Sequence, residues 1–272
     1  MSVIEWAGTG DPILLLHATG FHSRCWNEVV RCLPGRHIYA ADLRFHGASG
    51  DSGPVNWHIL TKDIRSLIER LDLTCLVGVG HSIGGYLIAR AAAHAPNRFK
   101  HLVLVDPVIC SAERYGEFLE LPEGFTAKDL PVSRRKNDWQ GADEMYERFK
   151  GREPFNSWQP AVLRDYCNHA LHPAADGEMR RLACDPINEA GIYLYQQGNE
   201  VILRELPMIT VPVTLLRAPT GQSSLADLSG SPTWPDLASA LPNCQEIFLP
   251  ELNHFIPMQD PALVASYIKA AQ

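Results

Sequence analysis

The chain has 272 residues, of which 46% are hydrophobic and 20% are charged. This length and composition suit one large domain, or one domain with an insertion, and they exclude a disordered or fibrous chain. The formal net charge is −7, and the densest basic run is only Arg134-Arg135-Lys136. We therefore expect no nucleic-acid partner.

The seven cysteines include no Cys-x-x-Cys pair, which argues against a disulfide framework and against a zinc knuckle. Cys75 lies in an apolar run, so we interpret it as a small core residue. The first ten residues have neither a basic segment nor an apolar stretch, and no apolar run is long enough to cross a bilayer. These features predict a cytoplasmic protein without a membrane partner.

Short apolar runs alternate with helical patterns through the first hundred residues. Such alternation implies a parallel sheet with helices on both of its faces. Ligands of such sheets bind beyond the carboxyl ends of the strands, so the residues just after each strand are candidates for chemistry. The predicted strands cover 13–16, 37–41, 75–79 and 101–105, and the predicted helices cover 26–33, 57–71 and 83–95.

The pattern changes in the middle of the chain. Over 107–206 the strand-like runs disappear, and charged, aromatic and Pro-rich helical segments replace them. We therefore predict a core domain over 1–106 and 207–272 that carries the middle segment as a helical cap. The last predicted elements are strands over 211–216 and 245–249 and a helix over 262–271.

A candidate nucleophile lies between a predicted strand and a predicted helix, where Gly80-His81-Ser82-Ile83-Gly84 matches Gly-x-Ser-x-Gly. A nucleophilic serine on a sharp turn requires this strand–turn–helix setting. The glycines leave room for neighbouring backbone, and the strained turn lifts the Ser82 hydroxyl clear of the sheet. The helix N-terminus also offers free N–H groups to a developing oxyanion. The alternative is a plain Gly-rich turn with a serine N-cap.

With this turn the sequence resembles the α/β-hydrolase superfamily, and further stretches fit in the same order. Residues 16–21 (Leu-His-Ala-Thr-Gly-Phe) are similar to the family's His-Gly segment, with Ala18 in place of the usual Gly. The resemblance implies an α/β-hydrolase fold, with a mostly parallel sheet, helices on both faces and the helical cap inserted after the strand over 101–105. It also implies an oxyanion hole formed by the N–H groups of Thr19 and Ile83.

A second loop, residues 42–49, is similar to the family's Asp-x-Arg-Gly-x-Gly-x-Ser loop. We interpret it as structural, with Asp42 and Arg44 as an ion pair. Most of the eleven histidines are expected to have no catalytic role. Among them, a role in shaping the oxyanion loop is expected for His17, and places in turns for His46 and His81.

The resemblance also implies a catalytic base and an acid. His254 follows the last predicted strand late in the chain, and the order Ser then His suits this fold. The family usually carries an Asp soon after the strand over 211–216, where this sequence has no carboxylate. Two candidates for the acid remain: Asp106, at the end of an earlier strand, and Asp227, at the usual spacing before His254. Asp236 is a weaker third candidate, because it is expected to start a helix.

These residues predict a serine hydrolase that cleaves a small carboxylic ester or lactone through an acyl-enzyme on Ser82. The expected partner is a small-molecule acyl substrate, with no metal and no organic cofactor; no oligomeric state is predicted. Carbon–carbon bond hydrolysis and lyase chemistry on the same fold are alternatives. A ligand-binding, receptor-like protein with little turnover is the rival from another class, and the missing carboxylate after 211–216 keeps it open.

Overall fold

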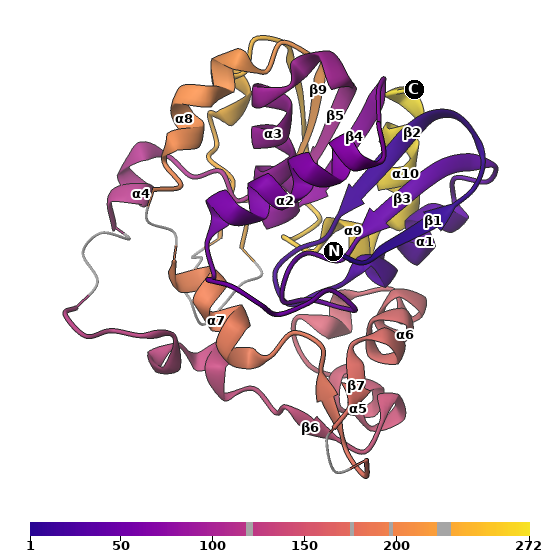
Figure 1. The fold of residues 1–272 in the computed structure, drawn as a ribbon, viewed down its shortest axis with the longest axis vertical. Coiled ribbons are helices and arrows are strands. Elements are labelled where there is room, and N and C mark those ends of the chain that lie inside the picture. Colours follow the sequence, from indigo (N-terminus) through magenta and orange to yellow (C-terminus); the bar gives the residue numbers. More distant parts are fainter. Residues whose placement is uncertain (118–121, 175–176, 196–197, 222–229) are drawn as a thin grey trace.

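The computed structural model describes residues 1–117, 122–174, 177–195, 198–221 and 230–272 (Figure 1). Seven strands form the main sheet in the order β1-β3-β2-β4-β5-β9-β10. The edge strand β1 pairs antiparallel with β3, and the other pairings are parallel. The strands are β1 (Val3–Trp6), β2 (Thr9–Leu16), β3 (Arg36–Ala41), β4 (Leu76–His81), β5 (Phe99–Val105), β9 (Val213–Arg217) and β10 (Cys244–Phe248).

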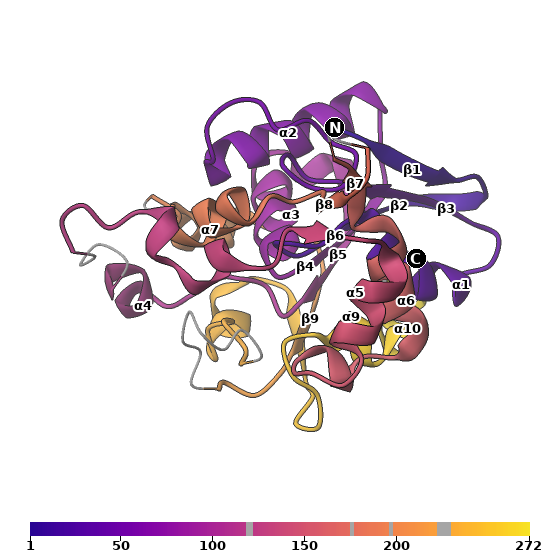
Figure 2. The same cartoon turned by 90° about the horizontal axis from the view of Figure 1, so that it is seen from below.

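Helices cover both faces of the sheet, as the predicted parallel architecture requires (Figure 2). Alternate residues of β2 enter different hydrophobic cores, because successive side chains of a strand point to opposite faces. Leu14 and Leu16 pack with α2 and α3, whereas Ile13 and Leu15 pack with α1 and α10. These helices are α1 (Asn27–Arg31), α2 (Trp57–Arg70), α3 (Ile83–His94) and α10 (Pro261–Ala270).

The register of the central strands determines which residues meet at the carboxyl edge. His81 of β4 pairs with Val105 of β5, and Val105 pairs with Leu216 of β9. The chain positions that follow this row of paired residues are therefore neighbours in space. Ser82 and Asp106 occupy two of them, although 24 positions separate them in the sequence.

Three details differ from the sequence-based expectation. The edge strand β1 was not predicted, because its partly exposed side chains form no apolar run. The expected helix over 26–33 is a short 3₁₀ turn followed by α1. Cys75 is exposed, so its interpretation as a core residue is wrong: it lies in the turn before β4 with a φ of 52°.

The segment between β5 and β9 is not purely helical. Three strands of two or three residues, β6, β8 and β7, form a small antiparallel sheet within it. Strands this short show no alternation of polar and apolar residues, so the sequence pattern did not reveal them. The strands are β6 (Asp138–Trp139), β7 (Leu171–Pro173) and β8 (Arg180–Leu182), and the helices are α4 (Ala112–Glu117), α5 (Ala142–Phe149), α6 (Pro160–His169), α7 (Pro186–Leu194) and α8 (Val201–Glu205).

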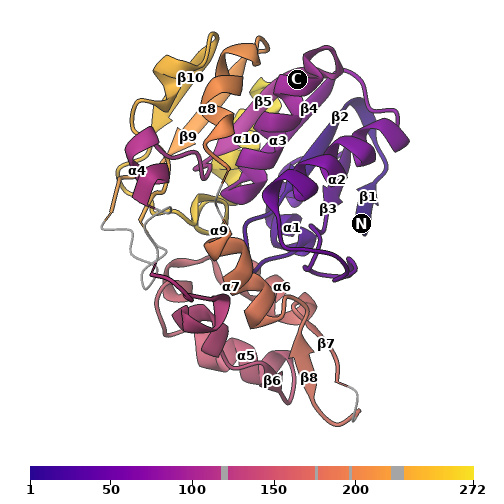
Figure 3. The ribbon, with the colours of Figure 1, turned by 60° about the vertical axis from the view of Figure 1, so that its left-hand side comes forward.

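The middle segment occupies two places in the fold (Figure 3). α5, α6 and α7 gather with the small sheet at one end of the main sheet, and α8 lies beside α3. Ile202 of α8 and the following Leu206 and Ile209 belong to the same hydrophobic core as α2 and α3. The division into a core domain and a cap over 107–206 stays a prediction.

The remaining elements are short. Within the described ranges, no helix is both long enough and apolar enough to cross a membrane. The last α-helix still to be named is α9 (Ile256–Gln259), and the 3₁₀ helices are η1 (Ser23–Trp26), η2 (Pro96–Arg98), η3 (Ala127–Asp129), η4 (Pro131–Arg134), η5 (Phe155–Ser157), η6 (Leu206–Met208) and η7 (Leu237–Ala240).

Candidate active site

Ser82 lies on a strained turn between β4 and α3. Its φ of 57° and ψ of −121° are rare for a residue with a side chain. A Cβ atom on Gly80 would lie 2.3 Å from the carbonyl oxygen of Gly84, and one on Gly84 would lie 2.3 Å from that of Leu16. Both glycines are therefore required by close backbone packing, and the turn has the sharp geometry that the sequence motif predicts.

His254 contacts both Ser82 and Asp106. Its Nε2 lies 3.0 Å from Ser82 Oγ, and its Nδ1 lies 2.6 Å from Asp106 Oδ2. All three side chains are buried. A carboxylate only accepts hydrogen bonds, so His254 carries its proton on Nδ1 and leaves Nε2 to accept from the serine hydroxyl. This hydrogen-bonded chain can move the Ser82 proton to the imidazole.

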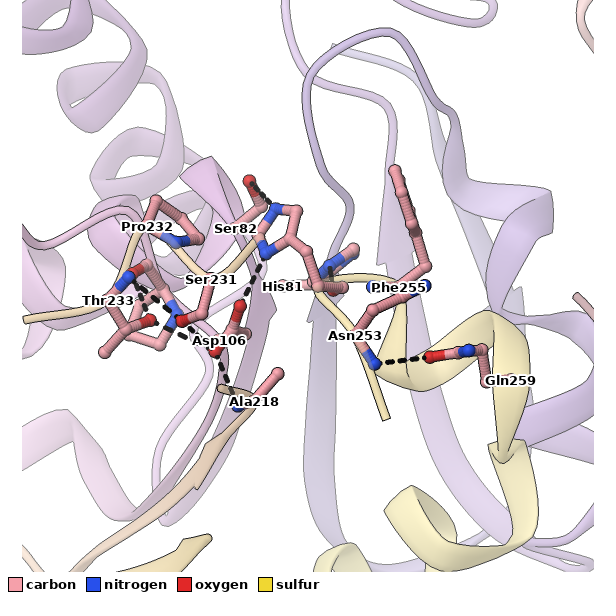
Figure 4. A network of polar contacts seen from close by, with 12 residues as sticks. His81, Ser82, Asp106, Ala218, Ser231, Pro232, Thr233, Asn253, Phe255 and Gln259 are labelled. Carbon is pink, nitrogen blue, oxygen red and sulfur yellow. Dashed lines mark hydrogen bonds and ion pairs between the residues drawn. The ribbon is translucent and has the colours of Figure 1, made fainter. Parts of the chain in front are cut away.

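The carboxylate of Asp106 is held by donors from another part of the chain (Figure 4). Its Oδ1 accepts hydrogen bonds from the Ala218 N–H at 2.9 Å and from the Ser231 hydroxyl at 2.7 Å. The hydroxyl of Thr233 lies 3.4 Å from the same oxygen and donates to the Pro107 carbonyl oxygen at 2.7 Å. The buried charge is therefore solvated by protein groups, as a buried carboxylate requires.

The other two candidates for the acid have different places. Asp227 lies outside the described residues. Asp236 precedes η7, as expected of a residue that starts a helix. Ala218, directly after β9, lies close to where the family's usual acid was sought, and its backbone N–H donates to Asp106 instead.

Sequence reasoning missed the donors to Asp106. Ser231 and Thr233 lie in a loop more than 120 positions from that carboxylate, and no motif marks either residue. A second missed contact is made by His81, whose Nε2 lies 2.8 Å from the His254 carbonyl oxygen and donates to it. Burial lowers the pKa of His81 well below its ordinary value, so this ring is neutral. His81 therefore ties the serine turn to the His254 loop.

The backbone around His254 is held by its own side chains. The Phe255 N–H donates to Asn253 Oδ1 and the Asn253 N–H donates to Gln259 Oε1, both at 2.9 Å (Figure 4). The loop is thus closed on itself between β10 and α9. This closure limits how far the imidazole can move away from Ser82.

The two residues expected to stabilise an oxyanion belong to two different segments of the core, the start of α3 and the turn after β2. Ile83 is the first residue of α3, so its N–H has no acceptor in a preceding helical turn. Thr19 is buried in the turn that follows β2. Polar contacts around this turn come from His17 and His46, and the expected role of His17 in shaping the oxyanion loop stays a prediction.

The expected ion pair between Asp42 and Arg44 is not formed. The guanidinium of Arg44 donates two hydrogen bonds to Asp63 of α2, at 2.8 and 2.7 Å. Asp42 instead accepts from the backbone N–H groups of Ser23 at 2.7 Å and Ala48 at 2.9 Å. The loop after β3 therefore folds around Asp42, which faces inward, while Arg44 reaches α2.

Aromatic residues of the middle segment cover the two loops of the site. Trp158 contacts Phe21 of the turn after β2 and Phe255, the residue after His254, with ring centroids 5.3 and 5.5 Å apart. Phe21 and Phe255 also contact each other, with centroids 6.0 Å apart. The end of the segment that carries α6 therefore packs directly against both loops.

An ion pair between the partly exposed Arg135 and the buried Glu189 lies beside these aromatic rings. Arg135 Nη1 donates to Glu189 Oε2 of α7 at 2.5 Å, and Arg135 Nη2 donates to the Tyr166 hydroxyl at 3.1 Å. Burial raises the pKa of Glu189, and the Arg135 charge opposes this shift. A cavity of about 10 Å³, lined in part by Gly20, Arg135 and Tyr166, holds at most one water molecule.

No group of three or more His, Cys, Asp or Glu side chains in the described part of the chain is arranged to hold a metal ion. The residues brought together at the carboxyl edge of the sheet are a serine, an imidazole and a carboxylate. Their arrangement supports proton transfer and nucleophilic attack by Ser82.

Comparison with known proteins places this site in a family. The sequence profile described as "Alpha/beta hydrolase family" matches residues 13–267. The pimeloyl-[acyl-carrier protein] methyl ester esterase of Nitrosomonas europaea is 25% identical over 253 residues, which cover 92% of this chain and 91% of that protein. The esterase Rv0045c of Mycobacterium tuberculosis is 29% identical over 129 residues, which cover 47% of this chain and 43% of that one.

Solved structures agree on the fold. The E-2-(acetamidomethylene)succinate hydrolase superposes with a TM-score of 0.75 at 20% identity, covering 98% of this chain and 93% of its own. The thioesterase domain from the curacin biosynthetic pathway superposes with a TM-score of 0.74 at 20% identity, covering 98% and 94%. The predicted fold class is thereby confirmed, and the profile match over nearly the whole length shows that this chain belongs to the alpha/beta hydrolase family of hydrolytic enzymes.

Proposed function

We propose that this protein hydrolyses a small carboxylic ester or lactone through an acyl-enzyme on Ser82. The observation that carries the proposal is the hydrogen-bonded chain from Ser82 Oγ through His254 to Asp106 on a strained turn. Strain of this kind and a buried charge both cost folding free energy, and a serine nucleophile with its base gives them a purpose.

In the first step Ser82 Oγ attacks the carbonyl carbon of the ester while its proton passes to His254 Nε2. The new C–O bond places a negative charge on the former carbonyl oxygen. The N–H groups of Thr19 and Ile83 donate to that oxyanion. The protonated His254 then gives its proton to the leaving alkoxide oxygen as the original ester C–O bond breaks, and the acyl group stays on Ser82.

In the second step a water molecule replaces the alcohol. It loses a proton to His254 Nε2 and attacks the acyl carbon, and the second oxyanion collapses with departure of Ser82 Oγ. The proton returns from His254 to Ser82, and the carboxylic acid leaves. Asp106 keeps the imidazole in the Nδ1-protonated tautomer and stabilises the imidazolium in both steps.

Ester substrates are supported by the relatives. The Nitrosomonas europaea protein is named a methyl ester esterase, and the Mycobacterium tuberculosis protein is named an esterase. Solved structures with the same fold include an enol-lactonase at 20% identity.

The test is hydrolysis of short and medium p-nitrophenyl esters by the wild type and by Ser82→Ala, together with labelling by a fluorophosphonate. We expect turnover and one labelled serine in the wild type, and neither in Ser82→Ala. A folded wild-type protein without turnover and without a label at Ser82 would refute the proposal. Tight ligand binding in its place would identify a receptor-like protein.

A further inference from the structure

Two peptide groups flank Thr19, the residue to which we assign one oxyanion N–H. The carbonyl of the first, between Ala18 and Thr19, lies 2.8 Å from His17 Nδ1. The N–H of the second, between Thr19 and Gly20, donates to His46 Nε2 at 3.0 Å. Each peptide group is thus contacted by one imidazole.

The second nitrogen of His17 determines its tautomer. Nε2 accepts a hydrogen bond from the Leu43 N–H at 3.0 Å, so it carries no proton. The proton of the neutral ring is then on Nδ1, which donates to the Ala18 carbonyl oxygen. His17 therefore donates within the loop after β2 and accepts from the loop after β3.

His46 has the same tautomer as His17, but the loops to which it donates and from which it accepts are exchanged. Its Nε2 accepts from Gly20, so its Nδ1 carries the proton and donates to the Arg44 carbonyl oxygen at 2.9 Å. His46 therefore donates within the loop after β3 and accepts from the loop after β2. The two ring centroids lie 5.0 Å apart, so the rings link the loops reciprocally at one point.

Both rings are almost completely buried. Burial lowers the pKa of His17 to about 3 and that of His46 to about 4. A neutral imidazole has one donor and one acceptor, and each ring uses both. Protonation would turn each Nε2 into a donor that faces a backbone N–H. The hydrogen bonds from Leu43 to His17 and from Gly20 to His46 therefore exist only while the rings are neutral.

Because the peptide bond is planar, these contacts determine the direction in which the Thr19 N–H points. In a trans peptide the C=O and the N–H point in opposite directions, so a hydrogen bond that holds the Ala18 carbonyl also orients the Thr19 N–H. The Phe21 N–H donates to the same carbonyl at 3.2 Å. His46 holds the following peptide plane, so rotation about the backbone of Thr19 is restricted from both sides.

We propose that His17 and His46 are positioning residues that hold the two peptide planes around Thr19 and thereby aim its N–H at the oxyanion. This inference rests on the proposed serine-hydrolase function. It adds that correct aim depends on one particular nitrogen of each ring: Nδ1 of His17, which holds the Ala18 carbonyl, and Nε2 of His46, which holds the Gly20 N–H.

Substitution by asparagine or by glutamine distinguishes the role of Nδ1 from that of Nε2. Asparagine places its amide nitrogen near the position of Nδ1, and glutamine places its amide oxygen near the position of Nε2. At position 46, His46→Gln keeps an acceptor for the Gly20 N–H and His46→Asn loses it. At position 17 the order is reversed, because His17→Asn keeps a donor to the Ala18 carbonyl and His17→Gln loses it.

The experiment measures kcat and KM of the four variants with one p-nitrophenyl ester. We expect His46→Asn and His17→Gln to lose about 10- to 100-fold in kcat at similar KM, somewhat less than the removal of a whole oxyanion donor. His46→Gln and His17→Asn should stay within about threefold of wild type, well inside that loss. A role in stability alone would give no reversal of the Asn and Gln order between the two positions.

A second readout is the ratio of kcat for an ester to kcat for the matching thionoester, whose sulfur is a poor acceptor. A misaimed Thr19 N–H lowers this ratio, whereas partial unfolding leaves it unchanged. Thermal unfolding and fluorophosphonate titration of Ser82 give the folded fraction of each variant. Where a variant does not fold, the ratio of the two kcat values in the folded variants tests the inference.

Three results would contradict the inference or the function on which it rests. Equal ratios in wild type and folded variants, or failure of all four variants to fold, would assign the two rings to stability and overturn the inference. An inert wild type without a label at Ser82 would instead refute the proposed function on which the inference rests.

Discussion

Asp106 combines complete burial, a positive φ of 44° and contacts to three separate segments. A carboxylate in this position has one oxygen for His254 and another for neutral donors. The donors satisfy the buried charge without protonating it, so it can remain an acceptor throughout a proton transfer on His254. One side chain thus joins three segments of the chain and also presents a negative charge to His254.

We expect Asp106→Asn to lower kcat by about 10⁴-fold while the protein stays folded, because an amide at this point favours the wrong tautomer of the imidazole. Ester hydrolysis and unfolding by guanidinium chloride measure the two quantities. Asp227→Asn is the matched control, and it should retain nearly full activity. A large loss in Asp227→Asn with an active Asp106→Asn would transfer the role of acid to Asp227.

The sequence sufficed to single out Ser82 and His254, because a strand–turn–helix motif and a position after the last strand are local signals. It left Asp106 and Asp227 as alternatives, because the choice depends on which loop folds toward the imidazole. The donors Ser231 and Thr233 illustrate the same limit: they meet Asp106 only through tertiary structure.

At the level of secondary-structure elements, the contact between α7 and the loop after β2 depends on Gly20. Its φ is +80°, and a Cβ atom there would lie 2.5 Å from Glu189 Oε1. The same carboxylate of Glu189 is paired with Arg135. The helix α7 therefore contacts the loop after β2 through Gly20 and the Glu189 carboxylate.

We expect Glu189→Gln to reduce the free energy of unfolding by roughly 2 kcal/mol, because it removes the charged partner of a guanidinium that is only partly exposed. The double variant with Arg135→Gln should recover part of this loss. Guanidinium chloride unfolding of the two single variants and the double variant measures the coupling as a thermodynamic cycle. Additive losses would show that the two charges do not stabilise each other.

Element prediction from the sequence was accurate where one pattern covered a whole element. The helices α2 and α3 and the buried strands β2, β4 and β5 agree with the predicted ranges to within a few residues. The edge strand β1 and the strands of the middle segment were missed, since β1 and β6 pair with distant parts of the chain and β7 and β8 have only three residues each. Pairing of this kind leaves little trace in local hydrophobic periodicity.

For the molecule as a whole, buried neutral histidines make stability depend on pH. Burial lowers the pKa of His17 to about 3 and those of His22 and His46 to about 4. In the unfolded chain these residues titrate near 6.5, so below that pH the unfolded state binds more protons than the folded state. The stability that these groups contribute above pH 6.5 is therefore lost as the pH falls toward 4.

We expect the free energy of unfolding to drop between pH 7 and pH 5, with a contribution of about 2 kcal/mol from His46 alone. Chemical unfolding at both pH values tests this. The slope with pH should be smaller in His46→Gln and unchanged in His172→Gln, whose side chain is exposed. A stability that is flat or rises on acidification would contradict the assignment of neutral buried rings.

The row of paired residues His81, Val105 and Leu216 has a consequence for how such enzymes diverge. Asp106 at the end of β5 and Ala218 just beyond β9 meet at 2.9 Å, so the same point in space can be supplied from either strand end. Under the proposed function, a carboxylate at either strand end would therefore reach the imidazole while the serine and the histidine keep their places. Neighbouring parallel strands thus make chain position and catalytic role partly interchangeable.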